Sequence, residues 1–190
     1  MASAAALSAA LRAGLLANDD AGAIDNDALQ ALCDEVGAAV VGEVAASPLL
    51  WEAYDSTGGV NVGSAATVVI DTIGQDSDDV DLAAGVVTIN RAGTYRVHGR
   101  VTVNATSGTS RSITECYLER DPGDGFAAVP GTYGLIYNRE VTEGGGVASF
   151  FRVIDLDVGD LLRLRADRIS GTSTIETIAN GSGLMIEEVT

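Results

Sequence analysis

The chain changes its hydrophobic pattern near Pro48. Residues 1–50 are rich in alanine and leucine and place apolar residues three or four positions apart, whereas residues 51–190 alternate apolar and polar positions in short runs. The first spacing is typical of one face of an α-helix, and the second is typical of a half-buried β-strand. The pattern predicts a mainly β fold with a short N-terminal α-helical segment.

Two helices are predicted within residues 1–50, separated by the polar stretch 18–22. Their apolar stripes consist of Leu7, Leu11 and Leu15 in the first helix and Leu29, Leu32, Val36 and Val40 in the second. Helices of this length are marginal in water, so the stripes need a packing partner. We expect a docking or oligomerisation segment, packed on sister copies or on another protein. A helical hairpin on the same domain is the alternative.

Ten strands are predicted after Pro48, with glycine- and aspartate-rich turns between them. They cover residues 51–55, 65–73, 79–83, 86–90, 94–104, 111–120, 131–138, 146–156, 160–169 and 181–189. Short strands separated by regular polar turns predict an all-β sandwich, and long sequence gaps between pairing partners favour a jelly roll. Residues 51–190 are therefore predicted to form one jelly-roll domain.

The clearest alternation lies within Gly85–Val103. One side of the predicted strand carries Tyr95, Val97, Gly99, Val101 and Val103, and the other carries Arg96, His98, Arg100 and Thr102. We expect the first side to face the core. The second side is either a solvated strand face or a cationic stripe of Arg96, His98 and Arg100 that contacts carboxylates of a neighbouring subunit or a ligand.

The predicted strand 146–156 is apolar on both faces. Phe150, Ile154 and Leu156 fall on one side, and Val147, Phe151 and Val153 fall on the other. A sandwich strand buries one face in its own core, so the second face must meet a loop or another subunit. We expect a trimer interface that includes Phe150, Phe151 and Val153 together with Arg96, His98 and Arg100.

Three short motifs follow one another in a characteristic order: Ala92-Gly93-Thr94-Tyr95, Val158-Gly159-Asp160 and Gly183-Leu184-Met185-Ile186. In this order, residues 51–190 resemble the globular head of complement component one-q and the tumour necrosis factor superfamily. The resemblance implies a jelly roll in which the Gly-Tyr pair opens a central strand and the Gly-Asp pair forms a turn between two long strands. It also implies a homotrimer packed around a threefold axis.

Charge excludes one large class of function. The formal net charge is −16 at pH 7, and all 11 cationic residues are arginine. Nucleic-acid binding requires cations that neutralise phosphates, so no nucleic-acid partner is expected. The N-terminal apolar run is interrupted by Arg12 and is too short to span a bilayer, so no membrane insertion is expected. Cys33 and Cys116 are interpreted as two buried free thiols.

Few residues suggest chemistry. His98 is the single histidine, which removes most nucleophile and base arrangements, and its arginine neighbours make it a poor proton acceptor. The acidic stretch containing Asp76, Asp78, Asp79 and Asp81 is the best candidate for Ca²⁺, because this ion prefers several oxygen ligands from a flexible loop. Some members of the resembled family bind calcium. The alternative is an exposed acidic loop without a metal, and we expect no cofactor.

These inferences converge on a non-enzymatic, trimeric structural protein. We expect a component of a phage or phage-like virion, such as a head fibre, spike or decoration protein. Residues 1–50 would dock on a capsid or another virion protein, and the jelly roll would be displayed outward, where a host-surface glycan is a further expected partner. The alternative is a bacterial carbohydrate-binding or adhesin module of the same fold. A hydrolase on a β-sandwich is a third class, for which no carboxylate pair stands out.

Overall fold

The structure is a computed structural model that describes residues 49–139, 141 and 145–189. The chain divides into two units after Ser47, and the statements below concern the described part of the second unit. The predicted helices and the docking residues lie outside the described residues; these residues are Leu7, Leu11, Leu15, Leu29, Leu32, Val36 and Val40. The helical part of the predicted fold class therefore stays a prediction.

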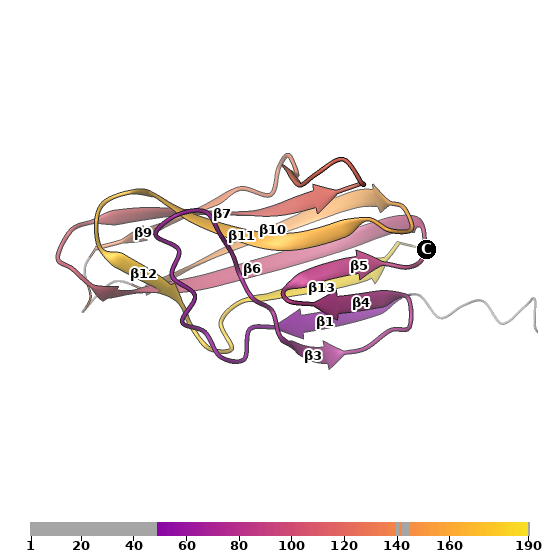
Figure 1. Cartoon of the computed structure of the whole chain (residues 1–190), viewed down its shortest axis with the longest axis horizontal. Helices are drawn as coiled ribbons and strands as arrows, with labels where there is room; N and C mark the ends of the chain where they lie inside the picture. The colour runs from indigo at the N-terminus through magenta and orange to yellow at the C-terminus, as the bar shows by residue number, and fades with distance from the viewer. Residues whose placement is uncertain (1–48, 140, 142–144, 190) are drawn as a thin grey trace, which may run out of the picture. The chain divides into compact units, whose positions relative to one another are not determined.

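The described residues form thirteen strands and no helix (Figure 1). The strands are β1 (Leu50–Tyr54), β2 (Ala66–Thr67), β3 (Thr72–Gln75), β4 (Val80–Ala83), β5 (Val86–Ile89), β6 (Gly93–Ser107), β7 (Ser112–Asp121), β8 (Ala127–Ala128), β9 (Gly134–Asn138), β10 (Gly145–Leu156), β11 (Leu161–Ser170), β12 (Thr174–Thr177) and β13 (Gly183–Glu188). The four longest strands are β6, β10, β7 and β11; the first two belong to one sheet and the last two to the other.

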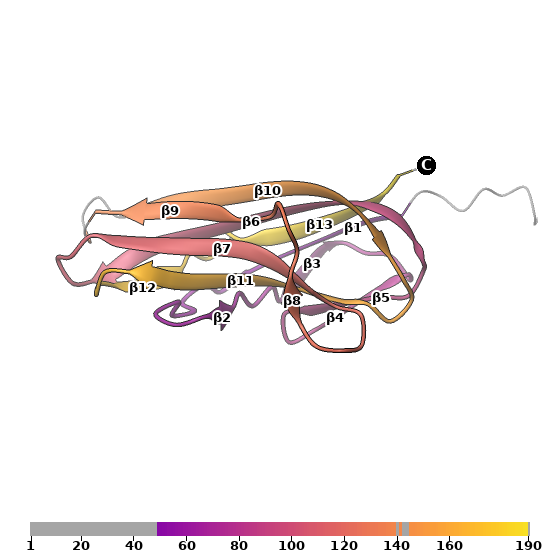
Figure 2. The same cartoon turned by 90° about the horizontal axis from the view of Figure 1, so that it is seen from above.

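The strands pair in two antiparallel sheets that stack as layers (Figure 2). Sheet A has the order β10-β6-β13-β1-β3, with β12 also paired to β6. Sheet B has the order β4-β5-β11-β7-β8, with β2 paired to β11 and β9 paired to β7. Most neighbours in a sheet are distant in sequence, as a jelly roll requires. The predicted mainly β, jelly-roll sandwich is confirmed for this unit.

Strand β6 shows how the alternating sequence builds the core. Tyr95, Val97 and Val101 are buried, whereas His98 and Arg100 on the opposite face are exposed. The predicted sidedness of this strand is therefore confirmed. Both sheets contribute further buried side chains, of which the largest are Trp51, Ile70, Ile89, Leu118, Leu156, Leu162, Leu164, Ile175, Leu184 and Ile186. The core is thus mainly aliphatic, with the aromatic side chains of Trp51, Tyr95 and Phe150.

The start of β6 is fixed by the residues around its Gly-Thr-Tyr motif. The hydroxyl of Tyr95 donates a hydrogen bond of 2.6 Å to the carbonyl oxygen of Arg91, and burial raises the pKa of Tyr95. The guanidinium of Arg91 lies 2.8 Å from Asp79 and 2.6 Å from Glu188. These contacts join the beginning of β6 to the turn before β4 and to the last strand, β13.

The predicted turn at residues 158–160 connects β10 to β11. Gly159 has a φ of 93°, a backbone conformation that favours glycine. The carboxylate of Asp160 is buried, and it accepts a 2.7 Å hydrogen bond from the backbone N–H of Asp157. It also lies 2.6 Å from the guanidinium of Arg120, so the turn is attached to β7.

The predicted strand 65–73 is wrong as a continuous element. Its ends are β2, which pairs with β11 in sheet B, and β3, which pairs with β1 in sheet A. The residues between them cross from one sheet to the other, and Val68 and Ile70 are fully buried on the way. An apolar run that crosses the core has the same composition as a buried strand, so sequence pattern alone does not distinguish the two.

Two shorter differences concern turns and short strands. The predicted strand 131–138 begins only at Gly134, because Gly131 adopts a φ of 83° in the preceding turn. The two-residue β8 and the four-residue β12 were not predicted. Strands of this length carry too few positions for alternation to be recognised.

Candidate functional site

One side of the sandwich carries a group of large apolar side chains that are exposed. Strand β10 lies at the edge of sheet A, and β9, paired to β7, belongs to sheet B. We call the outward-facing group the apolar side; its members are Tyr133, Leu135, Tyr137, Val147, Phe151 and Val153, between 46% and 64% exposed. Surface apolar side chains are common singly, but several on two neighbouring strands favour an interaction surface.

Strands β9 and β10 approach each other closely on their inner faces without forming hydrogen bonds to each other. Glycines permit this approach: a Cβ atom on Gly134 would lie 2.8 Å from the Cβ of Ala148, and a Cβ on Gly146 would overlap Ile136. Tyr133 is held in place by stacking on Tyr117, with ring centroids 4.9 Å apart. The apolar side is therefore built mainly on two strands, each of which is hydrogen-bonded to its own sheet.

The structure separates the two adjacent phenylalanines of β10. Phe151 is 56% exposed on the apolar side, as the prediction of two apolar faces implies. Phe150 points into the sandwich, where it is 9% exposed and its ring occupies the space above Gly99 of β6. Phe150 was expected at the trimer interface, but its side chain belongs to the core.

The predicted cationic stripe lies on the outer face of sheet A, beside the apolar side. In the β6–β10 register, Val153 is opposite Arg96, and Phe151 is opposite His98. The guanidinium of Arg96 lies 2.8 Å from the carboxylate of Glu187 and 5.9 Å from the centroid of the Phe151 ring. Arg96 is thus already partnered within the chain, which leaves the other two members of the stripe more accessible to a partner.

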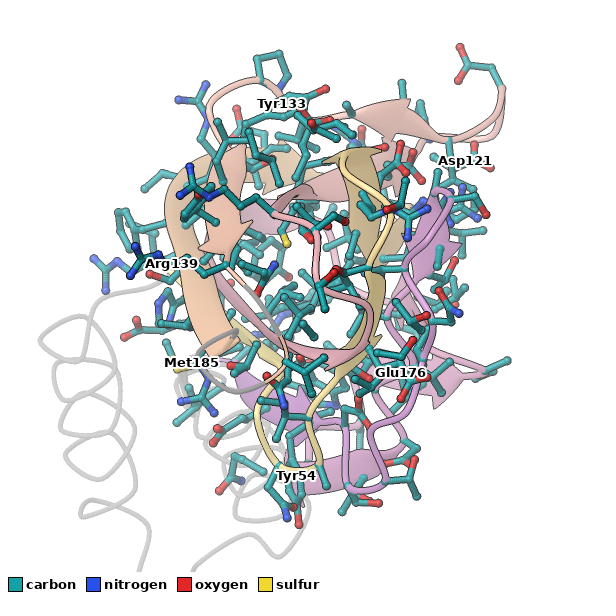
Figure 3. All side chains as sticks on the ribbon, turned by 90° about the vertical axis from the view of Figure 1, so that its left-hand side faces the viewer. Tyr54, Asp121, Tyr133, Arg139, Glu176 and Met185 are labelled. Atoms are coloured by element: carbon teal, nitrogen blue, oxygen red, sulfur yellow. The ribbon has the colours of Figure 1, made fainter. Side chains whose placement is uncertain are left out.

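The side chains of His98 and Arg100 have no hydrogen bond or ion pair within the described residues. Together with Tyr54, Glu52 and Met185 they line a shallow depression of about 140 Å³. The depression exists because Gly183 of β13 stands between Arg100 and the tyrosine. Met185 points away from the sandwich at this face (Figure 3).

The acidic stretch between β3 and β4 is partly occupied by protein partners. The carboxylate of Asp79 forms an ion pair with Arg91 at 2.8 Å, and Asp81 accepts a 2.8 Å hydrogen bond from Asn90. Asp76 accepts a hydrogen bond from the backbone of the next residue, and Asp78 is exposed. In the part of the chain that the structure describes, no three His, Cys, Asp or Glu side chains are grouped to hold a metal ion.

The remaining candidates for chemistry are isolated from one another. Cys116 is 2% exposed, and burial raises the pKa of its thiol to about 12, so the reactive thiolate is scarce at neutral pH. His98 lies on the opposite sheet without an acidic or nucleophilic hydrogen-bond partner among the described residues. Within the same residues, no helix has the length and apolar character needed to cross a bilayer.

Sequence reasoning missed the contribution of β9 to the apolar side. Tyr133, Leu135 and Tyr137 alternate with the buried Ile136, so both faces of this short strand are apolar, as in β10. The sequence contains the signal for this surface, because apolar residues occupy both faces of the predicted strand 131–138. The same test that identified β10, two apolar faces on one strand, would have identified β9.

Comparison with known proteins identifies the fold. No known protein family and no curated protein matches the chain. Eiger, a tumour necrosis factor from S. frugiperda, matches with a TM-score of 0.58 and 15% identity over 75% of this chain and 93% of its own. The crystal structure of murine APRIL at pH 5.0 matches with a TM-score of 0.55 and 9% identity over 75% of this chain and 100% of its own. The crystal structure of murine APRIL at pH 8.5 matches with a TM-score of 0.53 and 10% identity over 74% of this chain and 98% of its own. The described unit therefore has the tumour-necrosis-factor-like jelly-roll fold.

Proposed function

We propose that the chain is a non-enzymatic structural protein that forms a homotrimer through the apolar side. The observation that carries the proposal is the group of six exposed apolar side chains, five on β9 and β10 and the sixth, Tyr133, directly before β9. Each copy has a formal charge of −16, so copies repel one another except where burial of apolar area outweighs the repulsion. The apolar side offers such an area.

A closed ring of three copies needs two different surfaces on each copy. In the proposed trimer, the apolar side of one copy contacts the outer face of sheet A of the next. That face offers the exposed Leu50, the half-buried Met185 and the polar side chains of His98 and Arg100. Stable interfaces of this kind bury about 2,000 Å² or more in total. A trimer is also what the sequence resemblance implies.

The mass of the assembly tests this part of the proposal. Light scattering should give three times 19.4 kDa for the full chain. Phe151→Asp with Leu135→Asp places two charges on the apolar side and should give a folded monomer. Val158→Asp is the matched control, because Val158 is 66% exposed in the turn after β10, outside the apolar side, and this variant should stay trimeric. A single-copy mass for the wild-type chain at high concentration would refute the trimer.

The biological role is a proposal of the same kind. We propose a virion component of a phage or phage-like particle, with residues 1–50 docked on a capsid or other virion protein and the jelly roll displayed outward. The abrupt change of composition near Pro48 supports a division between an attachment segment and a displayed domain. The acidic, lysine-free composition fits a surface that stays soluble and avoids nucleic acid.

Electron microscopy of purified particles tests the virion role. Antibody labelling against the jelly roll should decorate intact particles. Deletion of residues 1–47, which keeps the buried Leu49 and all of β1, should abolish decoration while the remaining domain keeps its trimeric mass. Particles that lack the protein altogether would remove the virion role. Sugar binding by a protein that never associates with particles would favour the alternative, a carbohydrate-binding or adhesin module.

A further inference from the structure

A groove at one end of the sandwich, beyond the apolar side, has features of a ligand site. It consists of two adjoining depressions of about 530 Å³ and 400 Å³ that share Arg120 and Ile154. One wall is formed by the beginning of β6 and the end of β10, and the other by the end of β7 and the segment that carries β8. Figure 2 shows this segment rising from sheet B toward β9. Depressions of this size are typical of small-molecule sites.

Two arginines face the groove, and they differ in how they are held. The guanidinium of Arg120 is occupied: it lies 2.6 Å from Asp160 and donates a 3.1 Å hydrogen bond to the carbonyl oxygen of Asp155. The side chain of Arg152 has no hydrogen bond or ion pair within the described residues, and its guanidinium reaches to Gly131, next to Pro130 of the opposite wall. Arg152 is therefore the cation that remains available to a ligand.

The other polar groups of the groove suit hydroxyl groups. Thr94 donates a 2.6 Å hydrogen bond to one carboxylate oxygen of Asp155, which leaves the second oxygen to accept from a ligand. Asp124 lines the adjoining half. A ligand with several negative charges would be repelled by these two carboxylates, whereas a ligand with one carboxylate and several hydroxyl groups satisfies both charge signs.

The apolar lining suits the C–H face of a sugar ring. Ile154 contributes to both halves of the groove, and Val129 and Pro130 form part of the wall opposite β10. Aliphatic side chains pack against the flat, apolar face of a ring, and the guanidinium binds a carboxylate with two parallel hydrogen bonds. Val153 borders the groove and also belongs to the apolar side, so in a trimer the neighbouring copy would lie next to the site.

We propose that this groove binds an acidic monosaccharide, a uronic or sialic acid unit, with its carboxylate on Arg152 and its hydroxyl groups on Asp155 and Thr94. The inference deepens the proposed function, on which it rests, by naming the ligand class that the displayed jelly roll takes. An acidic peptide is the competing ligand class, and it fits less well because each further carboxylate would approach Asp124 or Asp155.

Calorimetry on the full chain tests the groove, with glucuronate and N-acetylneuraminate as probes and their uncharged methyl esters as ligand controls. The acids should bind and the esters should bind at least tenfold more weakly, because the esters cannot form a charged pair with Arg152. Arg152→Gln should raise the Kd of the acids about 10- to 100-fold. Arg111→Gln is the matched control, since Arg111 is also exposed and its side chain has no partner within the described residues.

Several results overturn the inference: no binding of either acid, equal binding of acids and esters, an unchanged Kd in Arg152→Gln, or tighter binding of a tri-aspartate peptide than of the sugar acids. Light scattering on the same samples separates this inference from the trimer. Arginine-dependent binding of a sugar acid by a single-copy protein supports the groove and removes the trimer. A trimeric mass without sugar binding removes the groove and keeps the trimer.

Discussion

The contact between Gly99 and Phe150 gives a quantitative test of the core. Gly99 lies in the middle of β6 and its φ is not in the positive range that favours glycine, so its backbone accepts a side chain. What excludes a side chain is space, because a Cβ atom there would overlap the ring of Phe150. Gly99→Val therefore overpacks the site, and Phe150→Ala leaves a cavity at the same place.

The magnitudes follow from these two effects. Phe150 is 9% exposed, so its truncation should lower the free energy of unfolding by about 3–5 kcal/mol. Gly99→Val should lower it by about 1–3 kcal/mol, the usual cost of forcing extra carbon atoms into a packed core. In the double variant, the valine fills part of the volume that the ring vacates. Its loss should be smaller than the sum of the single losses by about 1–3 kcal/mol.

Urea unfolding of the four proteins at one fixed concentration measures this coupling, because the apparent stability of an oligomer depends on concentration. Gly74→Val is the control: Gly74 also has an ordinary φ, but its nearest neighbours would lie 3.8 Å from a new Cβ atom. That variant should change the free energy of unfolding by no more than about 0.5 kcal/mol. Additive losses at positions 99 and 150 would refute the proposed contact between them.

Three further predictions concern the described unit. Burial raises the pKa of Cys116 to about 12. In a Cys33→Ser variant, which leaves Cys116 as the single thiol, this thiol should resist iodoacetamide at pH 8 in the folded protein and react fully in urea, as followed by mass spectrometry. Rapid reaction of the folded protein would contradict the buried thiol. Arg120→Ala removes the cation that lies 2.6 Å from the buried Asp160 and should lower the free energy of unfolding by about 3 kcal/mol in urea titrations. Arg120→Lys keeps the charge and should lower this free energy less. Equal stability of the two variants and the wild-type protein would contradict the pairing. Backbone hydrogen bonds, chiefly from the N–H of Gly125, lower the pKa of Asp121 below the ordinary 3.8, so the loop is stabilised above that pH and its stabilisation is lost as the pH falls through the lowered value. In an NMR pH titration, the amide shifts of Gly123 and Gly125 should move with a midpoint below pH 3.8, and a midpoint at or above 3.8 would contradict these hydrogen bonds.

Much of the fold was predictable because alternation determines which face of a strand is buried. The sidedness of β6 and the two apolar faces of β10 were read from the sequence and agree with the burial of their residues. The crossing at Val68–Asp71 was not predictable, because an apolar run passing between two sheets looks like a strand. Which sheet each end joins is decided by its partners, β11 for β2 and β1 for β3.

The candidate sites divide in the same way. The exposure of Phe151 and Val153 was predicted because the sequence of a strand shows which residues share each of its faces. The sequence of β9 contains the same information. The groove around Arg152 was not predictable from local pattern. Arg120 belongs to sheet B and Arg152 to sheet A. They line one groove because the last residues of β7 and of β10 lie at the same end of the sandwich.

Charge and shape together restrict how copies of this protein can meet. The described residues contain more carboxylates than cations, and like charges close together at an interface are unfavourable unless they are paired. Arginines are spread over the described unit, and several are already paired within the chain, such as Arg91, Arg96 and Arg163. The cations without such a pair include Arg100 on the outer face of sheet A and Arg152 at the groove. In the proposed trimer, a contact between the apolar side and the face that carries Arg100 would bring a cation rather than a further carboxylate to the interface. It would leave Arg152 at the border of the assembly, open to the proposed acidic ligand.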